Sequence, residues 1–170
     1  RGSYEGQHSP KRADDATPFK GHYLQDAWEK GVIIGVMASP DHGGGHGKFG
    51  VWAKDLNRNS LFEAIRKRHT YGTSGPKISL KFSSINAIMG DKVDVKDPKT
   101  FKVSVVAGND IEKITILRNN KKVYESKPNN KKAELIWSDI HSTANKRLWY
   151  YVRIQTIGGH LAWSSPIWFL

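Results

Sequence analysis

The residues of this chain that are best suited to chemistry lie in a glycine-rich stretch between positions 39 and 48. Asp41 and His42 are adjacent there, and His46 follows after three consecutive glycines. Because the sequence contains no cysteine, a metal ion has to be held by imidazole and carboxylate groups, which bind divalent ions such as Mn, Zn and Fe. Consecutive glycines also let the backbone turn sharply and let a metal ion or a phosphate approach the main chain. On spacing alone, a metal-binding loop and a flexible polar turn with surface histidines are equally good interpretations.

The elements before this stretch predict where it lies in the fold. Apolar residues recur at helical spacing from about residue 22 to 30, and Gly31 follows where a left-handed C-cap would stand. The next run, residues 32–37, is apolar without alternation, which predicts a strand covered on both faces, as in the parallel sheets of α/β folds. Because α/β enzymes place their chemistry just beyond the carboxyl ends of such strands, we expect Asp41 and His42 to lie at a strand end.

A change of composition near residue 75 predicts a second region. Before it, residues 49–53 predict a short strand, and residues 59–68 predict a helix with Asn57 or Asn59 as its N-cap. After it, helical periodicity gives way to short apolar or β-branched runs that are separated by turn residues. These runs are 78–82, 101–106, 113–117, 123–125, 133–137, 149–156 and 161–169. Such a pattern is typical of an antiparallel β-sandwich, so we predict two domains, residues 1–75 and 76–170.

The net charge of +11 invites comparison with proteins that bind nucleic acids. The Lys and Arg residues are spread over the whole chain, however, and their small clusters are not interleaved with aromatic residues as in single-strand binders. We therefore do not expect a nucleic-acid interface, whereas an excess of cations suits an anionic substrate such as a phosphate ester. No apolar run is long enough to span a bilayer, so we expect no membrane segment. The sequence does not indicate a compartment.

Several stretches of the chain resemble an uncharacterised family that is allied to the PHP superfamily and is known only by a number, 3604, among families of unknown function. They are GVMASPDHGGGHGK at 35–48, VWAKDL at 51–56, AIRKRHTYGTSG at 64–75, WYYVR at 149–153 and AWSSPIW at 162–168. The resemblance covers residues 19–90 and 148–169 well and the region between them loosely. A long composite match of this kind is more specific than any one of its motifs.

This resemblance implies a metal-dependent hydrolase. PHP proteins are α/β barrels whose strand ends hold metal ions with His, Asp and Glu, and they typically hydrolyse phosphate esters with a metal-activated water. By this analogy Asp41 and His42 are the last pair of metal ligands. The usual pattern separates the Asp and the His by one residue, whereas here they are adjacent, so His46 is the alternative to His42. Lys48 is a candidate for binding the anionic substrate, with a plain surface cation as the other interpretation.

The resemblance also implies that part of the barrel is missing. The other ligands of the superfamily, including a His-x-His pair, have no counterpart in these 170 residues. Glu5 lies in a segment that resembles an earlier family motif, and it is either a site residue or a solvated loop residue. We therefore expect an α+β fold, with a fragment of a PHP-type α/β barrel in residues 1–75 and an antiparallel β-sandwich-like domain after it. The chain alone is then expected to be inactive.

A second class of function stays open beside the hydrolase. In it the β-rich domain is a non-catalytic module that binds a polysaccharide or a protein partner, and the Asp-His loop holds at most one weak metal ion. Trp149, Trp163 and Trp168 are candidates for an aromatic platform under a sugar, although strand alternation places several of them in the core. We interpret His69, which follows the second predicted helix, as structural.

Overall fold

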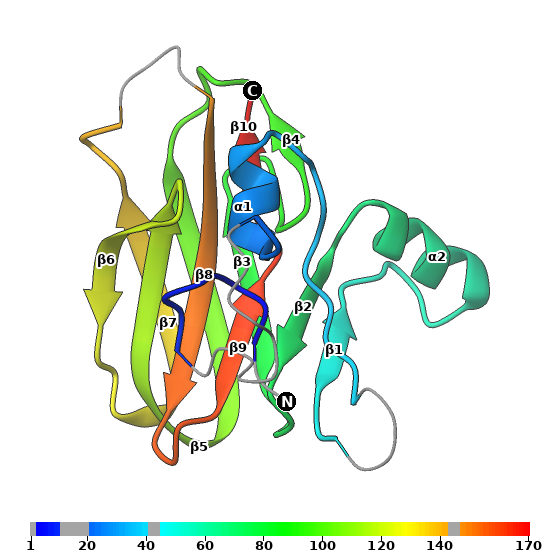
Figure 1. Cartoon of the computed structure of the whole chain (residues 1–170), viewed down its shortest axis with the longest axis vertical. Helices are drawn as coiled ribbons and strands as arrows, with labels where there is room; N and C mark the ends of the chain where they lie inside the picture. The colour runs from blue at the N-terminus through cyan, green and yellow to red at the C-terminus, as the bar shows by residue number, and fades with distance from the viewer. Residues whose placement is uncertain (1–2, 11–20, 41–44, 143–146) are drawn as a thin grey trace. The chain divides into compact units, whose positions relative to one another are not determined.

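The computed structural model describes residues 3–10, 21–40, 45–142 and 147–170, which form two compact units, Arg1–Ile34 and Gly35–Leu170. The described residues contain two helices and ten strands (Figure 1). In chain order these are α1 (Leu24–Glu29), β1 (Lys48–Val51), α2 (Arg58–Arg66), β2 (Thr70–Thr73), β3 (Ser79–Ser84), β4 (Lys92–Val93), β5 (Thr100–Arg118), β6 (Lys121–Ser126), β7 (Asn130–Ser138), β8 (Leu148–Thr156), β9 (Leu161–Ser164) and β10 (Ile167–Phe169). The chain is therefore mostly β.

The first unit is built around α1, and the predicted helix is confirmed there. The Asp26 carboxylate caps its start by accepting hydrogen bonds from the backbone N–H groups of Tyr23 (3.0 Å) and Gly21 (3.1 Å). Gly31 ends the helix with a φ of 87°, which favours glycine. Trp28 is buried, and its indole N–H donates to the carbonyl of Ile34 at 3.0 Å. The helix is thus capped at both ends and held by one buried aromatic side chain.

The second unit contains one continuous, open and mixed sheet of all ten strands. Six of them follow the order β1-β2-β9-β8-β10-β4, and β5 connects β3, β6, β7 and β8. Among the pairs described, β10 with β4 is parallel, and the others are antiparallel. The long strand β5 therefore joins the two parts of the sheet.

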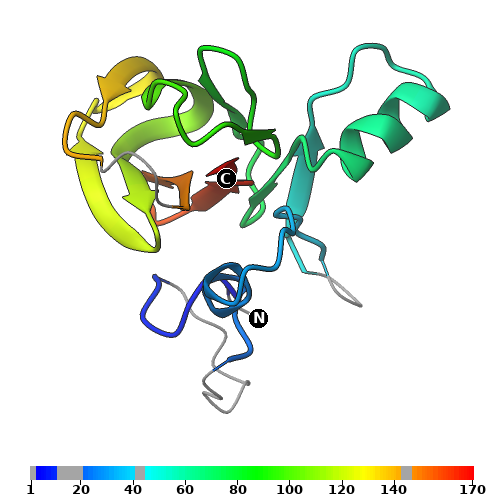
Figure 2. The ribbon, with the colours of Figure 1, turned by 90° about the horizontal axis from the view of Figure 1, so that it is seen from above.

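Strand β5 bends, and so it can pair with strands in both parts of the sheet. A straight strand would place Phe101 and Arg118 roughly 56 Å apart, at about 3.3 Å per residue. Yet the ring of Phe101 lies 4.5 Å from that of Tyr150 on β8, and Tyr150 is the residue that pairs with Arg118 at the other end of β5. The bend coincides with the break in the β5–β7 register between Val106 and Ile111. Figure 2 shows the resulting curvature of the yellow-green strands, which encloses an aromatic core of Phe82, Phe101, Tyr150 and Phe169.

This architecture shows that the expected fold class is wrong. Residues 32–37 do not form the predicted strand, and Val32 and Met37 are exposed by 45% and 52%. β1 and β2 flank α2 but run antiparallel to each other, with Lys48 opposite Thr73, so they are not a βαβ unit of a PHP-type α/β barrel. The later strands belong to the same hydrogen-bonded sheet rather than to a separate sandwich, because β2 pairs with β9. The predicted domain limits, 1–75 and 76–170, stay a prediction.

Candidate functional site

The segment that leads into the glycine-rich loop is held by a closed ring of hydrogen bonds. The backbone N–H of Val36 donates to Ser165 Oγ at 2.8 Å, and the hydroxyl of Thr70 donates to the carbonyl of Val36 at 2.8 Å. The two hydroxyl oxygens lie 3.2 Å apart. Because Thr70 has already used its only hydrogen, Ser165 must be the donor between them. All three residues are buried, so the ring satisfies polar groups that water does not reach.

The same segment packs on the main chain of β2. A Cβ atom at Gly72 would lie 3.1 Å from the Cβ of Ala38 and 3.4 Å from Cγ1 of Val36. The absence of a side chain at Gly72 therefore lets the segment approach the strand closely. This is the physical reason for the difference from the predicted strand: Val36 is buried, but side chains rather than a neighbouring strand satisfy the hydrogen-bonding groups of its backbone.

The two ends of the loop close on each other. A Cβ atom at Gly45 would lie 2.1 Å from the carbonyl oxygen of Pro40, and one at Gly47 would lie 2.5 Å from that of Ser39. Both distances are too short for any side chain, so the backbone can follow this path only with glycine at both positions. Asp41 and His42, the predicted metal ligands, lie outside the described residues.

His46 and Lys48 are the two predicted site residues that the structure describes. Both are exposed, and His46 packs so closely on Gly75 that a Cβ there would lie 2.7 Å from His46 Cβ. The Lys48 ammonium, on β1, donates to the carbonyl of Gly75 at 3.0 Å. Ser74 in turn exchanges two hydrogen bonds of 2.9 Å with the backbone of Leu161. The exit of the loop is therefore fixed to the turn that follows β2.

The described part of this site contains one imidazole and one ammonium group. Across residues 3–10, 21–40, 45–142 and 147–170, no three His, Asp or Glu side chains come together in a group that could hold a metal ion. The assignment of Asp41, His42 and His46 as ligands, and of Lys48 as a substrate-binding residue, thus stays a prediction. Glu5 is only 3% exposed, so its interpretation as a solvated loop residue is wrong.

His69 belongs to a second polar group, which the sequence did not indicate. Its Nε2 lies 2.8 Å from Oδ1 of Asp91, and the other carboxylate oxygen of Asp91 accepts a hydrogen bond of 2.9 Å from the backbone N–H of Ile88. The carbonyl of His69 accepts from the backbone N–H of Trp52 at 2.9 Å. These contacts tie the residues after α2 to the turn before β4, which agrees with a structural role for His69.

A third polar group lies between β5 and β8. Oδ2 of the buried Asp139 accepts hydrogen bonds from the guanidinium of Arg118 at 2.7 Å and from the hydroxyl of Tyr150 at 2.8 Å. Burial, together with the hydrogen bond to Asp139, raises the pKa of Tyr150 far above its usual range. The hydroxyl of Tyr150 therefore keeps its proton and acts as a donor in the core. No local pattern indicates this group, since its members are far apart along the chain.

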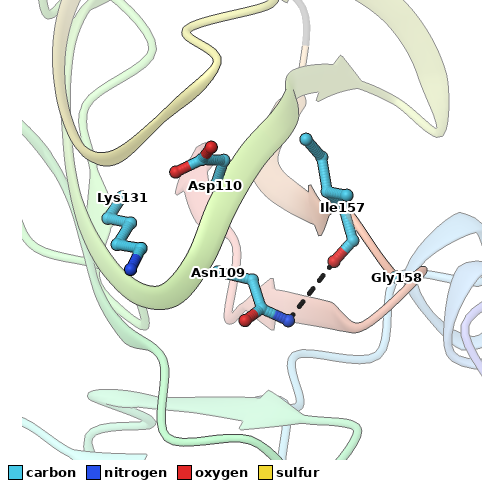
Figure 3. A pocket seen from close by; sticks show the side chains of 5 residues that line it. All are labelled: Asn109, Asp110, Lys131, Ile157 and Gly158. Atoms are coloured by element: carbon cyan, nitrogen blue, oxygen red, sulfur yellow. Dashed lines mark hydrogen bonds between the residues drawn. The ribbon is translucent and has the colours of Figure 1, made fainter.

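A shallow hollow of about 410 Å³ lies where the bend of β5 meets the turn between β8 and β9 (Figure 3). It is lined by Asn109, Asp110, Lys131, Ile157 and Gly158. The backbone N–H of Ile157 donates to the carbonyl of Asp110 at 2.8 Å, and the Asn109 amide lies 3.4 Å from the carbonyl of Ile157. One carboxylate and one ammonium on an open surface do not define a site.

The tryptophans at the C-terminal end pack mainly in the core. Trp168 is fully buried and Trp149 is 7% exposed, whereas Trp163 is partly exposed. The expectation that several of these residues face inward is confirmed, and they do not form an exposed aromatic platform. In the part of the chain that the structure describes, neither helix has the length and apolar character needed to cross a membrane.

Comparisons with known proteins find relatives without an assigned function. A family model described as "Protein of unknown function (DUF3604)" matches residues 3–113. An uncharacterized protein of Chlamydia pneumoniae is 27% identical over 156 residues, which cover 82% of this chain and 25% of the relative. Uncharacterized proteins of Chlamydia muridarum and Chlamydia trachomatis serovar D are each 29% identical over 134 residues, covering 69% of this chain and 22% of the relative. The chain thus spans about a quarter of the length of these relatives. No solved structure matches it.

Proposed function

This chain belongs to the DUF3604 family of proteins of unknown function, and we propose that its glycine-rich loop forms part of a divalent metal site in a hydrolase. The proposed substrate class is a phosphate ester, and the proposed ions are Mn, Zn or Fe. The resemblance of its sequence motifs to PHP-type hydrolases supports the proposed metal chemistry alone. It does not extend to a barrel in this chain.

The observation that supports the proposal best is the way in which the loop is positioned. Gly45 and Gly47 lie against the carbonyl oxygens of Pro40 and Ser39 at distances that exclude a side chain, and the ring of hydrogen bonds around Val36 fixes the entry to the loop. These contacts hold both ends of the loop in one position. A metal site requires such positioning, because its ligands must be held close to their binding geometry.

Asp41 and His42 are the residues that would hold the metal ion, with His46 as the alternative to His42. One carboxylate and one or two imidazoles are a donor set that suits Mn, Zn and Fe. A bound divalent ion supplies an activated water and neutralises phosphoryl oxygens. Lys48 directly follows Gly47. Its ammonium group would attract an anionic substrate after giving up its hydrogen bond to the carbonyl of Gly75.

The chain supplies only part of the proposed site. Because it spans about a quarter of its relatives, the remaining ligands are proposed to come from the other parts of those longer proteins. We therefore expect metal binding by this chain without turnover of a phosphate ester, and activity in a full-length family protein.

The test is elemental analysis of the purified chain beside the double variant Asp41→Ala, His42→Ala. His141→Ala is the matched control, since His141 is exposed and contributes its backbone N–H, not its ring, to Asp139. Metal near one equivalent in the chain and in the control, but not in the double variant, supports the site. Equal metal content in all three proteins, or none in any of them, overturns it for this chain and favours the non-catalytic module.

A further inference from the structure

Residues 54–67, here called the helical arm, expose two large apolar side chains. Leu56 is 94% exposed and Phe62 is 58% exposed. The helix of the arm, α2, contacts β1 at its base. In both views of the ribbon, α2 stands away from the other strands of the curved sheet (Figures 1 and 2). The arm therefore presents apolar surface to solvent.

The apolar residues of α2 form a stripe along one side. Leu61, Phe62 and Ile65 are spaced by one, three and four residues, and Ala64 next to them is buried. Asn57 caps the start of the helix by accepting a hydrogen bond from the Ser60 N–H at 2.9 Å. A helix of nine residues has little stability of its own in water and depends on packing of its apolar stripe. The exposed part of the stripe is thus a surface suited to being covered.

The charges of the arm indicate what kind of surface covers it. Four cations, Lys54, Arg58, Arg66 and Lys67, outnumber two carboxylates, Asp55 and Glu63. Lys67 already pairs with Glu63 at 2.6 Å, and the Arg58 guanidinium lies 5.8 Å from the centre of the Phe62 ring. A second copy of the arm would bring like charges together, so a complementary surface carries carboxylates around an apolar groove.

We propose that the helical arm docks into an apolar groove with a rim of carboxylates, located in the part of the longer family proteins that this chain does not span. The arm lies inside the region that matches the family, residues 3–113. The relatives extend well beyond the matched region, since the match covers about a quarter of their length. A groove in the same polypeptide meets the arm at high effective concentration, so modest contact energy is enough for docking.

Hydrogen exchange measured by mass spectrometry tests this docking. The amide protection of α2 is compared between this chain and the helix that aligns with it in the full-length Chlamydia pneumoniae relative. We expect protection at least about tenfold higher in the full-length protein, because a docked helix opens less often. The difference should shrink as the salt concentration rises from about 50 to about 500 mM, since ion pairs at the rim are screened. Equal protection in the two proteins overturns the proposal.

Two variants of the full-length relative sharpen the test. The residue aligned with Phe62 is replaced by Ser, and as a matched control the residue aligned with Ile136, which is 72% exposed here, is also replaced by Ser. Only the first change should lower the protection of the helix to the value in this chain. An equal loss in both variants, or protection that rises with protein concentration as a second copy would cause, contradicts docking within one polypeptide. The comparison of the unmodified proteins decides the question if a variant does not fold.

Discussion

The glycine-rich loop and the core around β5 lie in the same unit but are held in different ways. The core is filled by large side chains, with the rings of Phe101 and Tyr150 4.5 Å apart. The loop is held differently: Gly45 and Gly47 have no side chain, so the backbone segments approach closely, and the hydroxyls of Thr70 and Ser165 hydrogen-bond to the segment before it. The core therefore stabilises the whole unit, whereas the loop contacts fix the position of a few backbone atoms. Changes in the first region should act on folding, and changes in the second on what the loop can bind.

The largest expected effect is that of Phe101→Ala. Phe101 is 1% exposed and lies within 5.9 Å, ring centre to ring centre, of Phe82, Tyr150 and Phe169. Its removal leaves a cavity between the two parts of the bent sheet and should lower the free energy of unfolding by about 3–5 kcal/mol. Urea unfolding followed by tryptophan fluorescence measures it. Leu56→Ala, at a site that is 94% exposed, is the control; a similar loss in both variants would contradict a core centred on Phe101.

Ser165→Ala tests the entry to the loop. The change opens the ring of hydrogen bonds and leaves the buried N–H of Val36 without its acceptor, which should cost about 1–3 kcal/mol. Hydrogen exchange at Val36 should accelerate more than exchange in β8. Ser142→Ala is the matched control, because its hydroxyl donates to the Asp139 carbonyl outside this ring. Unchanged exchange at Val36 would show that the ring does not hold the segment.

Gly45→Ala tests the closure of the glycine-rich loop. The added Cβ would lie 2.1 Å from the Pro40 carbonyl oxygen, so the loop must change its path at a cost of roughly 1–3 kcal/mol. We expect weaker metal binding in a calorimetric titration and little change in the cooperativity of unfolding. Gly108→Ala is the control, since a Cβ there has no neighbour within 4 Å. Loss of metal binding in both variants would show that the loss does not result from opening the loop.

Tyr150→Phe probes the polar group inside the core through its pH dependence. Because the pKa of Tyr150 is raised in the folded state, the folded protein keeps this proton at pH values at which an unfolded tyrosine, with a pKa of about 10, loses it. The contribution to stability is thus fully present below pH about 10 and declines above it, by at most about 1.4 kcal/mol per pH unit. The variant should lose about 1 kcal/mol at neutral pH and should fall less steeply at alkaline pH. Urea unfolding from pH 8 to 11 measures both effects.

Tyr4→Phe is the control for that experiment, since Tyr4 is 46% exposed. It should follow the unmodified chain at every pH. If Tyr150→Phe fell as steeply as the unmodified chain above pH 10, the hydroxyl of Tyr150 would not be the group responsible.

Local signals in the sequence were sufficient for many of the elements. Asn57 was one of two predicted caps of α2 and is the one that the helix uses. Asn119 and Asn120 suit a tight hairpin, and both adopt positive φ between β5 and β6. Gly31 ends α1 as predicted. Each of these features is decided by neighbours in the chain, so a single sequence contains the information.

The failures concern contacts between distant residues. The apolar run 32–37 signals burial but not the partner, and its partners, Thr70 and Ser165, stand 34 and 129 residues beyond Val36. The predicted strands 101–106 and 113–117 are one bent strand, because β7 and β8 pair with its two halves. For the candidate site, residue types predicted the loop and its ligands, which stay a prediction, whereas the closure of Gly45 on Pro40 needed the structure.

The smallest expected effect concerns Glu63 and Lys67 on the helical arm, which are the exposed counterpart of the buried group at Asp139. Their side chains are 65% and 57% exposed, so water screens the pair and removing it should leave the midpoint of thermal unfolding unchanged. The hydrogen bond from Lys67, followed by the charge of Lys67, lowers the pKa of Glu63. Lys67→Ala should therefore raise that pKa toward its usual value in an NMR titration of the carboxyl group. Lys122→Ala, which removes the 3.3 Å pair with Glu125 on β6, should leave the pKa of Glu63 unchanged. A fall in thermal stability with Lys67→Ala would mean that the arm is already packed against another surface, because removing one partner of a desolvated ion pair leaves an uncompensated buried charge.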